Sequence, residues 1–199
     1  MCIRDSIVAL VINMGYKSME TQVNQSLIRI IQGNITEQNT MAIVNAANSQ
    51  LIGGAGVDGA IRNAGGPTIT EECDQIRRER GGCPTGQAVI TSGGSLEAAY
   101  VIHTAGPVWK GGSANESKLL ANCYRSCLEL AVTHEISSLS FPSISTGIYG
   151  YPIEKAATTA LSSVDEFLRQ SNTLKEIRFI LFGSIDYSIY QQIASGILQ

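Results

Sequence analysis

The chain has 199 residues, a formal net charge of −3 and 44% hydrophobic residues. This length corresponds to about one domain, and the hydrophobic content is sufficient for a buried core. Fourteen basic residues against seventeen acidic ones exclude a strongly cationic surface, so we do not expect duplex nucleic acid as the main partner. The longest apolar run, residues 7–12, is far shorter than the ~20 residues that cross a bilayer, so no membrane span is predicted.

The five cysteines indicate a reducing compartment. Their number is odd, no Cys-x-x-Cys pair occurs, and Cys123 and Cys127 stand four residues apart in an apolar helical pattern that predicts buried thiols. Only two histidines, His103 and His134, are present, so we predict no metal, with a mixed Cys and His site as the open alternative. The N-terminal apolar stretch is too short for a signal peptide, which predicts a cytoplasmic protein.

The predicted elements alternate along the chain between strands and helices. Residues 1–18 fit no later pattern and are treated as an extension of unknown origin, followed by a single domain over residues 19–199. The predicted strands cover residues 27–31, 41–44, 87–91, 100–103, 139–142 and 177–182. The predicted helices cover residues 68–79, 113–134, 153–168 and 185–198. Thr68 and Glu71 match a capping box at the start of the first of these helices. Buried strands that alternate with helices predict an α/β/α sandwich.

Two segments rich in glycine follow predicted strands and lead into helices. They cover residues 45–61 and 143–152. Small residues leave backbone N–H groups free to face an anion, and the N-terminus of the following helix adds a favourable dipole. In an open α/β sheet, such loops meet at the carboxyl ends of the strands. The two segments therefore predict a clamp for one diphosphate, with ordinary turns between strand and helix as the alternative.

Residues 54–59 formally match the dinucleotide-binding fingerprint G-x-G-x-x-G. The match fails in its context, because eight residues separate the strand end at Asn45 from Gly54, whereas the fingerprint requires a tight turn. No second strand that ends in Asp or Glu follows about twenty residues later, and the lysine motif of a P-loop is absent from the sequence. These observations argue against an NAD-dependent oxidoreductase and exclude a P-loop nucleotidase.

With these motifs in place, the sequence resembles a macrodomain, and within that family the MacroD-like branch of ADP-ribose-linked hydrolases. The resemblance runs from about Leu27 to Leu198. It is carried by residues 33–36, 45–60, 101–107 and 143–152, and by Phe182 with the terminal helix. It implies a mixed, central β-sheet between two helical layers, in agreement with the sandwich that the elements predict.

The resemblance also implies where ADP-ribose would bind. The position of Asn34 is usually Asp in the family and bonds the adenine amino group, Ile35 would meet adenine through its backbone N–H, and Phe182 would stack on the ring. Core packing is the alternative for Phe182, because it ends a buried strand. The glycine-rich segments correspond to the two walls around the diphosphate, with Tyr149 beside the distal ribose. The wall residues are Gly54, Ala55, Gly56 and Val57 on one side, and Ser145, Thr146, Gly147, Ile148 and Tyr149 on the other.

Asn48 and Asp58 match the pair that is assigned to catalysis in MacroD-like hydrolases. The Asn48 amide would hold a ribose hydroxyl, and the Asp58 carboxylate would position or deprotonate a water. The alternatives are local, namely an Asn48 that holds its own turn and an Asp58 that caps a helix beginning near Gly59. Asn45 is interpreted as a structural tie. The family pattern around Asp58 favours the catalytic interpretation.

Two further residues, His103 and Arg62, affect the prediction for Asn48 and Asp58. No serine or cysteine is spaced to pair with His103, so we interpret it as a core residue and not as a base. The family commonly has His at the position of Arg62, so the resemblance does not predict which groups contact Asp58.

The resemblance predicts a cytoplasmic hydrolase that cleaves the ester at the distal ribose of ADP-ribose. Its substrates would be proteins ADP-ribosylated on Asp or Glu, and O-acetyl-ADP-ribose, and no cofactor is implied. The expected partners are ADP-ribose or ADP-ribosylated proteins. The alternative is a module that binds ADP-ribose without turnover. The presence of both Asn48 and Asp58 favours the enzyme, because a binding module needs the clamp but not the carboxylate.

Overall fold

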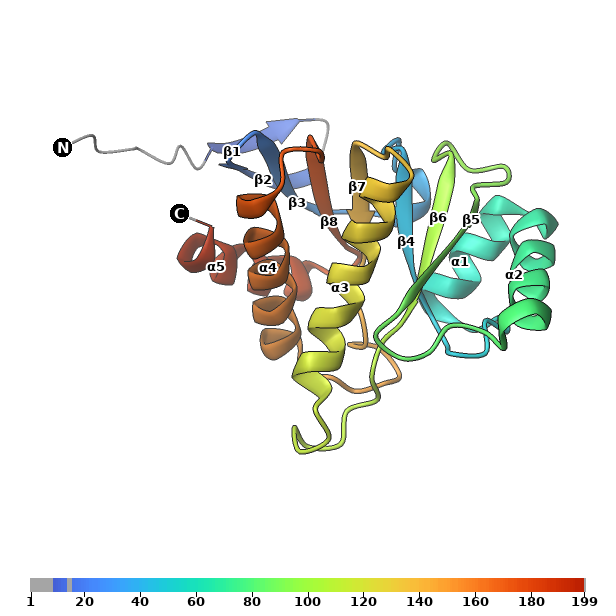
Figure 1. Ribbon diagram of the computed structural model, residues 1–199. Coiled ribbons are helices and arrows are strands. Elements are labelled where there is room, and N and C mark those ends of the chain that lie inside the picture. The colour runs from blue at the N-terminus through green and yellow to red at the C-terminus, as the bar shows by residue number, and fades with distance from the viewer. Residues whose placement is uncertain (1–8, 14–15, 199) are drawn as a thin grey trace.

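The computed structural model describes residues 9–13 and 16–198. The strands are β1 (Ala9–Asn13), β2 (Tyr16–Val23), β3 (Ser26–Gln32), β4 (Ala42–Ala47), β5 (Ala88–Ser92), β6 (Tyr100–Ala105), β7 (Ser138–Phe141) and β8 (Glu176–Leu181). The helices are the single 3₁₀ turn η1 (Ile35–Glu37), α1 (Gly56–Gly65), α2 (Pro67–Arg80), α3 (Glu116–Thr133), α4 (Ile153–Gln170) and α5 (Ser184–Ile197). Helices α3, α4 and α5 lie together, and α1 and α2 lie apart from them beside the far end of the sheet (Figure 1).

Across the described residues, eight strands form one sheet in the order β1-β2-β3-β8-β7-β4-β6-β5. The five central strands, from β3 to β6, run parallel to one another. The pairs β1 with β2, β2 with β3, and β5 with β6 are antiparallel, which confirms the predicted mixed sheet. Because the carboxyl ends of the parallel strands meet at one edge, the fold places the loops that follow these strands side by side.

The two faces of the sheet belong to two separate cores. Successive side chains of a strand point to opposite faces. In β4, Val44 therefore packs in the core with α3, α4 and α5, and Ile43 packs in the core with α1 and α2. In β8, Phe179 and Ile180 divide in the same way. This arrangement confirms the predicted α/β/α sandwich. None of the described helices is both long and apolar enough to cross a membrane.

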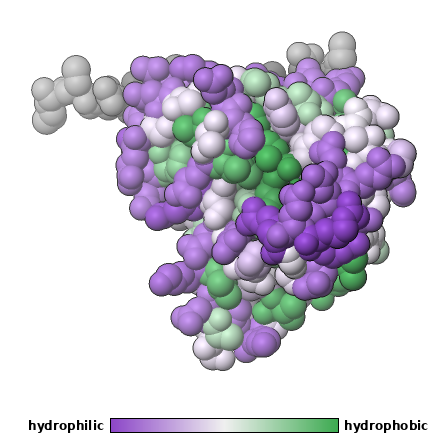
Figure 2. Space-filling view, turned by 45° about the vertical axis from the view of Figure 1, so that its right-hand side comes forward, coloured by the Kyte–Doolittle hydropathy of each residue, from purple (hydrophilic) through white to green (hydrophobic). Residues whose placement is uncertain are grey.

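Helix α2 buries a narrow apolar stripe and turns its charges outward. Ile69 and Cys73 are buried, whereas Arg78, Glu79 and Arg80 are exposed. In Figure 2, where the side of the molecule that carries α2 comes forward, the most hydrophilic patch lies on this side. The charges of α2 therefore form a solvent-facing surface.

The predicted capping box at the start of α2 is wrong. The helix begins at Pro67, and its N-cap is Gly66, which has φ of +79° and makes no side-chain hydrogen bond to the helix. Proline is favoured at the first helical position because its fixed φ suits the helix and its missing N–H needs no partner there. Thr68 therefore lies inside the first turn, where its hydroxyl does not cap the helix.

The N-terminal part of the chain contributes to the sheet. β1 pairs with β2, and β2 begins at Tyr16, so the boundary that we expected after residue 18 falls inside a strand. The residue pattern did not predict this pairing. Residues 1–8 lie outside the described residues, and the origin of the extension stays a prediction.

The buried-thiol interpretation of the cysteines is confirmed. Cys73, Cys83, Cys123 and Cys127 are all free and buried. Burial raises the pKa of the Cys123 thiol to about 11, outweighing hydrogen bonds that act in the opposite direction. These thiols therefore behave as apolar packing groups.

Candidate ligand-binding cleft

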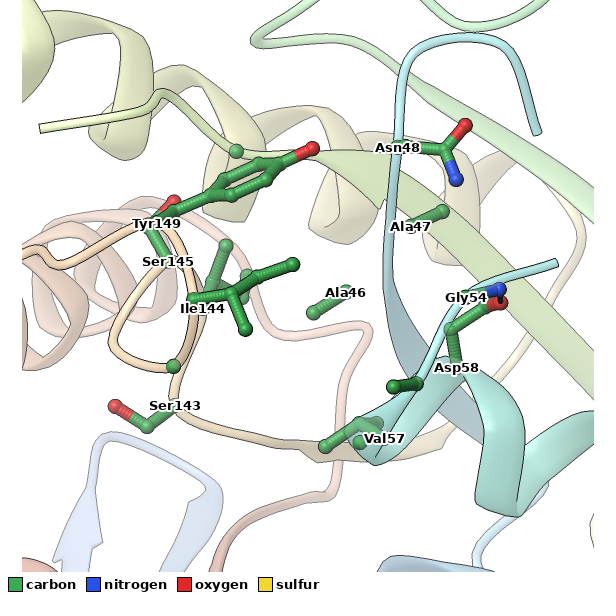
Figure 3. Close-up of a pocket in the computed structure, with 15 residues that line it drawn as sticks. Ala46, Ala47, Asn48, Gly54, Val57, Asp58, Ser143, Ile144, Ser145 and Tyr149 are labelled. Carbon is green, nitrogen blue, oxygen red and sulfur yellow. Dashed lines mark hydrogen bonds between the residues drawn. The ribbon is translucent and has the colours of Figure 1, made fainter. Parts of the chain in front are cut away.

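A cleft lies at the edge of the sheet where the parallel strands end. It consists of two cavities, of about 210 Å³ and 420 Å³, whose linings share Gly56, Val57, Ser143 and Gly147. Strands β4, β6 and β7 lead into the smaller cavity, and β3 and β8 lead into the larger one. Figure 3 shows the smaller cavity between the start of α1 and the loop that follows β7.

The first wall of the cleft is the segment of residues 54–57, at the N-terminus of α1. Within the described part of the chain, the backbone N–H groups of Ala55, Gly56 and Val57 donate to no acceptor. A Cβ on Gly59 would lie 2.8 Å from the carbonyl oxygen of Gly54, so only glycine lets the helix approach this segment so closely. Free N–H groups at a helix N-terminus form an anion-binding surface.

The second wall is the loop of residues 145–149. The N–H groups of Thr146, Gly147 and Ile148 likewise have no acceptor among the described residues. Ser145 has φ of +67°, and its buried Oγ has no hydrogen-bond partner in the described structure. Such left-handed backbone is strained for a residue with a side chain, and strain of this kind concentrates at functional sites. The structure thus brings the two glycine-rich segments to opposite sides of one cleft.

Backbone contacts hold this second wall in place. The N–H of Trp109 donates to the Tyr149 carbonyl at 2.9 Å, and the N–H of Tyr151 donates to the Ser145 carbonyl at 3.0 Å. At the end of β6, a Cβ on Gly106 would collide with the Oγ of Ser145. The loop is therefore packed directly against the sheet.

Asp58 is a buried carboxylate, 4% exposed, that accepts hydrogen bonds from three partners. Its Oδ1 accepts from Nδ2 of Asn45 at 2.6 Å, and its Oδ2 accepts from the N–H of Gly54 at 2.5 Å. The Nε of Arg62 lies 3.2 Å and 3.1 Å from the two oxygens. Because α1 begins at Gly56, Asp58 lies inside the first turn, and the interpretation of Asp58 as a helix cap is wrong.

Arg62 connects Asp58 to the rest of the first wall. Its side chain is 9% exposed. Nη2 donates to the carbonyl of Leu51 at 2.9 Å, and Nη1 donates to Oγ1 of Thr70 at 3.1 Å. A planar guanidinium can serve several acceptors at once, which a single imidazole could not do here. Arg62 therefore ties α1, α2 and the loop after β4 to one carboxylate.

His103 lies in the core behind this network. Its Nδ1 is 3.0 Å from Nδ2 of Asn45, and its Nε2 is 2.9 Å from Oγ1 of Thr91. Burial, and secondly the positive charge of Arg62, lower the pKa of His103 to about 3 against the opposing charge of Asp58. His103 is neutral and lines neither cavity of the cleft, as expected of a core residue. In the part of the chain that is described, no three His, Cys, Asp or Glu side chains gather closely enough to hold a metal ion.

Asn48 lies at the edge of the smaller cavity, opposite Tyr149 (Figure 3). Its Oδ1 accepts from the N–H groups of Gln50 at 3.1 Å and Ile52 at 3.3 Å, and its Nδ2 donates to the carbonyl of Ile52. Asn48 thus holds its own turn, as the local alternative predicted, and it also borders the cavity.

The larger cavity contains the residues that the resemblance assigns to adenine. Phe182 is 86% exposed, so its interpretation as a core residue is wrong. Asn34 caps η1: its Oδ1 accepts from the N–H of Thr36 at 3.1 Å and from Oγ1 of Thr36 at 2.9 Å. Its Nδ2 donates to Oε1 of Glu37 at 3.2 Å. Ile35 lies beside it, buried, and lines the same cavity.

Several lining residues were missed by the sequence prediction. They are Gly33, Ala46, Ala47, Ala60, Gly106, Pro142, Ser143, Ile144, Ile180, Leu181 and Asp186. Most of them lie in the last positions of the parallel strands or directly after them, and that position is a signal which could have found them. Asp186 lies in the first turn of α5, four residues after Phe182, and no local sequence pattern pointed to it.

The sheet order and the two helical layers define an α/β/α protein with a cleft at the ends of its parallel strands. The Macro domain family matches residues 44–160. A macro domain-containing protein of Caldanaerobacter subterraneus subsp. tengcongensis is 55% identical over 83% of this chain and 94% of its own. O-acetyl-ADP-ribose deacetylase 1 of Pantoea vagans is 51% identical over 82% of this chain and 95% of its own. The chain belongs to the macro domain family.

Solved structures agree with this assignment. The Oceanobacillus iheyensis macrodomain with ADP superposes with a TM-score of 0.88 and 44% identity, covering 91% of this chain and 96% of that one. The Trypanosoma brucei macrodomain in complex with ADP-ribose has a TM-score of 0.77 and 38% identity, covering 83% and 68%. The predicted family and fold are therefore confirmed.

Proposed function

We propose that the cleft binds ADP-ribose, with the diphosphate between the two walls. The observation that carries this proposal is a set of six backbone N–H groups that have no acceptor among the described residues and belong to residues on both sides of the cleft. These residues are Ala55, Gly56, Val57, Thr146, Gly147 and Ile148. Two phosphates need several donors from more than one direction, and a helix N-terminus adds a favourable field. The ligands named for the similar solved structures, ADP and ADP-ribose, support this choice.

The two cavities suggest the orientation of the ligand. The larger cavity offers the exposed ring of Phe182 and the apolar surface of Ile35, which suit a purine. The smaller cavity has Asn48, Asp58 and Tyr149 around it, which suit a ribose with its hydroxyl groups. In this orientation the distal ribose lies beside the two residues that we assign to chemistry.

The reaction we propose is hydrolysis of an ester at that distal ribose. A water oxygen bonds to the acyl carbon, the bond from this carbon to the ribose oxygen breaks, and the ribose oxygen takes up a proton. Asn48 would orient the ribose and Asp58 would hold the water. Each oxygen of Asp58 already accepts from two donors, so the water must share or replace one of these hydrogen bonds.

Proteins that carry ADP-ribose on Asp or Glu, and O-acetyl-ADP-ribose, are the substrates we propose. Both present an ester to the cleft, and the name of the Pantoea vagans relative supports the acetyl ester. No cofactor enters this reaction. The four free, buried cysteines favour a cytoplasmic setting, where thiols stay reduced.

A binding module without turnover is the second candidate. It is favoured by one observation: the oxygen of the Asn48 amide and both oxygens of the Asp58 carboxylate already accept two hydrogen bonds each within the protein. An enzyme must release part of these hydrogen bonds when the substrate arrives, whereas a binding module keeps them.

The experiment is to mix the protein with a glutamate-linked ADP-ribosylated protein and to follow release of labelled ADP-ribose in a single turnover. Calorimetry on the same sample measures the affinity for free ADP-ribose. Release together with binding establishes the hydrolase, and binding without release establishes the binding module. If neither occurs, the proposed function is wrong.

A further inference from the structure

The amide of Asn45 connects Asp58 to His103. Its Nδ2 lies 2.6 Å from Oδ1 of Asp58 and 3.0 Å from Nδ1 of His103. An amide nitrogen has two N–H bonds, so it can donate to both neighbours at once, provided that Nδ1 of His103 carries no proton. The buried Oδ1 of Asn45 has no hydrogen-bond partner in the described structure. The orientation of this amide therefore depends on which nitrogen of His103 is protonated.

Thr91 determines the protonated nitrogen of His103. Oγ1 of Thr91 donates its only proton to the carbonyl of Ser92 at 3.0 Å. The same Oγ1 lies 2.9 Å from Nε2 of His103, where it can only accept. Nε2 is therefore the protonated nitrogen, and Nδ1 is left as an acceptor. The thiol of Cys73, 4.0 Å from Nδ1 and 3.8 Å from Nε2, favours neither nitrogen.

The opposite tautomer of His103 would conflict with Asp58. A proton on Nδ1 would face the N–H of Asn45, and the amide would have to turn its oxygen toward both neighbours to relieve this contact. That oxygen would then lie against Oδ1 of Asp58, where Nδ2 is now 2.6 Å away, and the carboxylate would lose a donor. The tautomer with its proton on Nε2 keeps an N–H directed at Asp58.

We propose that His103 is a positioning residue for the hydrolysis: its Nδ1 orients the amide of Asn45, and Asn45 holds the Asp58 carboxylate in the geometry that the water requires. This inference rests on the proposed function, in which Asp58 holds the water. His103 acts through the direction of a hydrogen bond and not as a base. A role in core packing alone predicts instead that only the volume and polarity of this side chain matter.

The test is single-turnover release of ADP-ribose by the whole protein in His103→Leu and His103→Asn. Leucine offers no acceptor, whereas asparagine can place its amide oxygen where Nδ1 was. We expect His103→Leu to reduce turnover about tenfold and His103→Asn to stay within about threefold of the parent. Packing alone predicts the reverse order, because a buried amide costs more than a buried apolar side chain. Affinity for free ADP-ribose should change by about twofold at most, because His103 lines neither cavity.

Thr91→Val tests the same chain of hydrogen bonds without altering His103, and Thr104→Val is its matched control. Both threonines are buried. Oγ1 of Thr104 donates to the carbonyl of Gln87 at 2.7 Å and makes no hydrogen bond to His103 among the described residues. We expect Thr91→Val to lower turnover about threefold, because Nε2 loses the acceptor that fixes the tautomer, and Thr104→Val to leave turnover unchanged. Thermal unfolding of all variants checks that they are folded.

Nitrogen NMR of the isotope-labelled protein measures the tautomer directly. Burial, and secondly the charge of Arg62, lower the pKa of His103 to about 3 against the opposing charge of Asp58, so the ring is neutral near neutral pH. We expect the proton on Nε2 in the parent and in Thr104→Val, and a mixture of both tautomers in Thr91→Val. This measurement does not depend on turnover.

The outcomes separate this inference from the proposed function. A proton on Nε2, with faster turnover in His103→Asn than in His103→Leu, supports the inference. A proton on Nδ1 in the parent, or turnover in His103→Leu at or above that in His103→Asn, overturns it and leaves the hydrolase standing. If the His103 variants do not fold, the threonine pair decides: slower turnover in Thr91→Val than in Thr104→Val supports the inference, and equal turnover overturns it. If the parent protein releases no ADP-ribose, the proposed hydrolysis fails and the inference fails with it.

Discussion

The two walls of the cleft present the same kind of group, backbone N–H without an acceptor in the part of the chain that the structure describes, but they are held in different ways. The first wall depends on buried side-chain charges, since Asp58 bonds Gly54 and Arg62 bonds Asp58. The second wall depends on backbone hydrogen bonds and close packing, such as the contact of Gly106 with Ser145. Buried charges hold the N–H groups of the first wall in position, and close packing holds those of the second. Different substitutions should therefore disrupt the two walls.

This comparison predicts that the first wall is most sensitive to removal of a charge. Arg62→Ala should lower the free energy of unfolding by about 3–5 kcal/mol, because it leaves the buried Asp58 carboxylate without its cation. The control is Arg77→Ala, which breaks a half-exposed pair with Asp74 on α2 and should cost about 0.5 kcal/mol or less. Denaturant titration measures both. Equal, small losses in the two variants would show that Arg62 does not hold the first wall.

Asp58→Asn tests whether the same carboxylate also serves the reaction. An amide has one oxygen and one donor group, so it cannot accept from both Asn45 and Gly54 without conflict. We expect single-turnover release to fall by about 10²–10⁴, the contribution of a general base. ADP-ribose should also bind more weakly, because the Gly54 segment loses its tie.

The control for this change is Asp74→Asn on α2, which should leave turnover unchanged. If Asp58→Asn retains full turnover, Asp58 has no part in the mechanism.

The second wall should instead be sensitive to volume. In Gly106→Ala, the added Cβ would collide with Oγ of Ser145 and lie 2.7 Å from Cγ2 of Ile144. We expect a loss of about 1–3 kcal/mol in stability, as for other overpacked sites, together with weaker ADP-ribose binding. Gly196→Ala is the control, because nothing lies within 4 Å of its added Cβ in α5, and it should stabilise the helix by roughly 0.5–1 kcal/mol. A Gly106→Ala variant with parent-like stability and affinity would contradict the close packing of this wall.

The smallest effect on stability is expected at the purine end, outside both walls. Phe182 is 86% exposed, so Phe182→Ala should leave the free energy of unfolding within about 0.5 kcal/mol of the parent. Its ADP-ribose affinity should fall by about 1–3 kcal/mol through lost stacking. Ile185→Ala removes a neighbouring exposed side chain, 74% exposed, that lines neither cavity, and it should change neither quantity. Unfolding of Phe182→Ala would refute this surface role.

The sequence predicted the walls better than it predicted what holds them. Glycine-rich segments after apolar runs indicate loops at strand ends, because chain order and strand direction suffice for this inference. The tie between Asn45 and Asp58 bridges thirteen residues, and its geometry depends on how far α1 approaches β4. No local sequence pattern predicts a contact between residues that far apart in the chain. Nothing in the sequence predicted the left-handed backbone at Ser145. Residues other than glycine rarely adopt this conformation, so it depends on the surrounding fold and not on a local pattern.

The remaining differences between the prediction and the structure occur at the ends of strands and helices. An apolar run predicted a strand that includes Phe182, but β8 ends at Leu181 and the next side chain turns out into the cleft. Periodicity assigns residues to a face only while the strand continues. In the same way, the sequence pattern places Asp186 in α5, but only the packed fold shows that it lines the cleft.

The most direct test of the account is an NMR titration of the isotope-labelled protein with ADP-ribose, following the backbone amide signals of both walls. We predict that the amide protons of residues 55–57 and of residues 146–148 shift together and saturate at the same ligand concentration, because both walls bind one diphosphate. Free adenosine, which lacks the phosphates, should leave the amide signals of Ala55 and Ile148, which line the smaller cavity alone, nearly unchanged. Shifts confined to one wall, or equal shifts with adenosine, would contradict a clamp built from two sides.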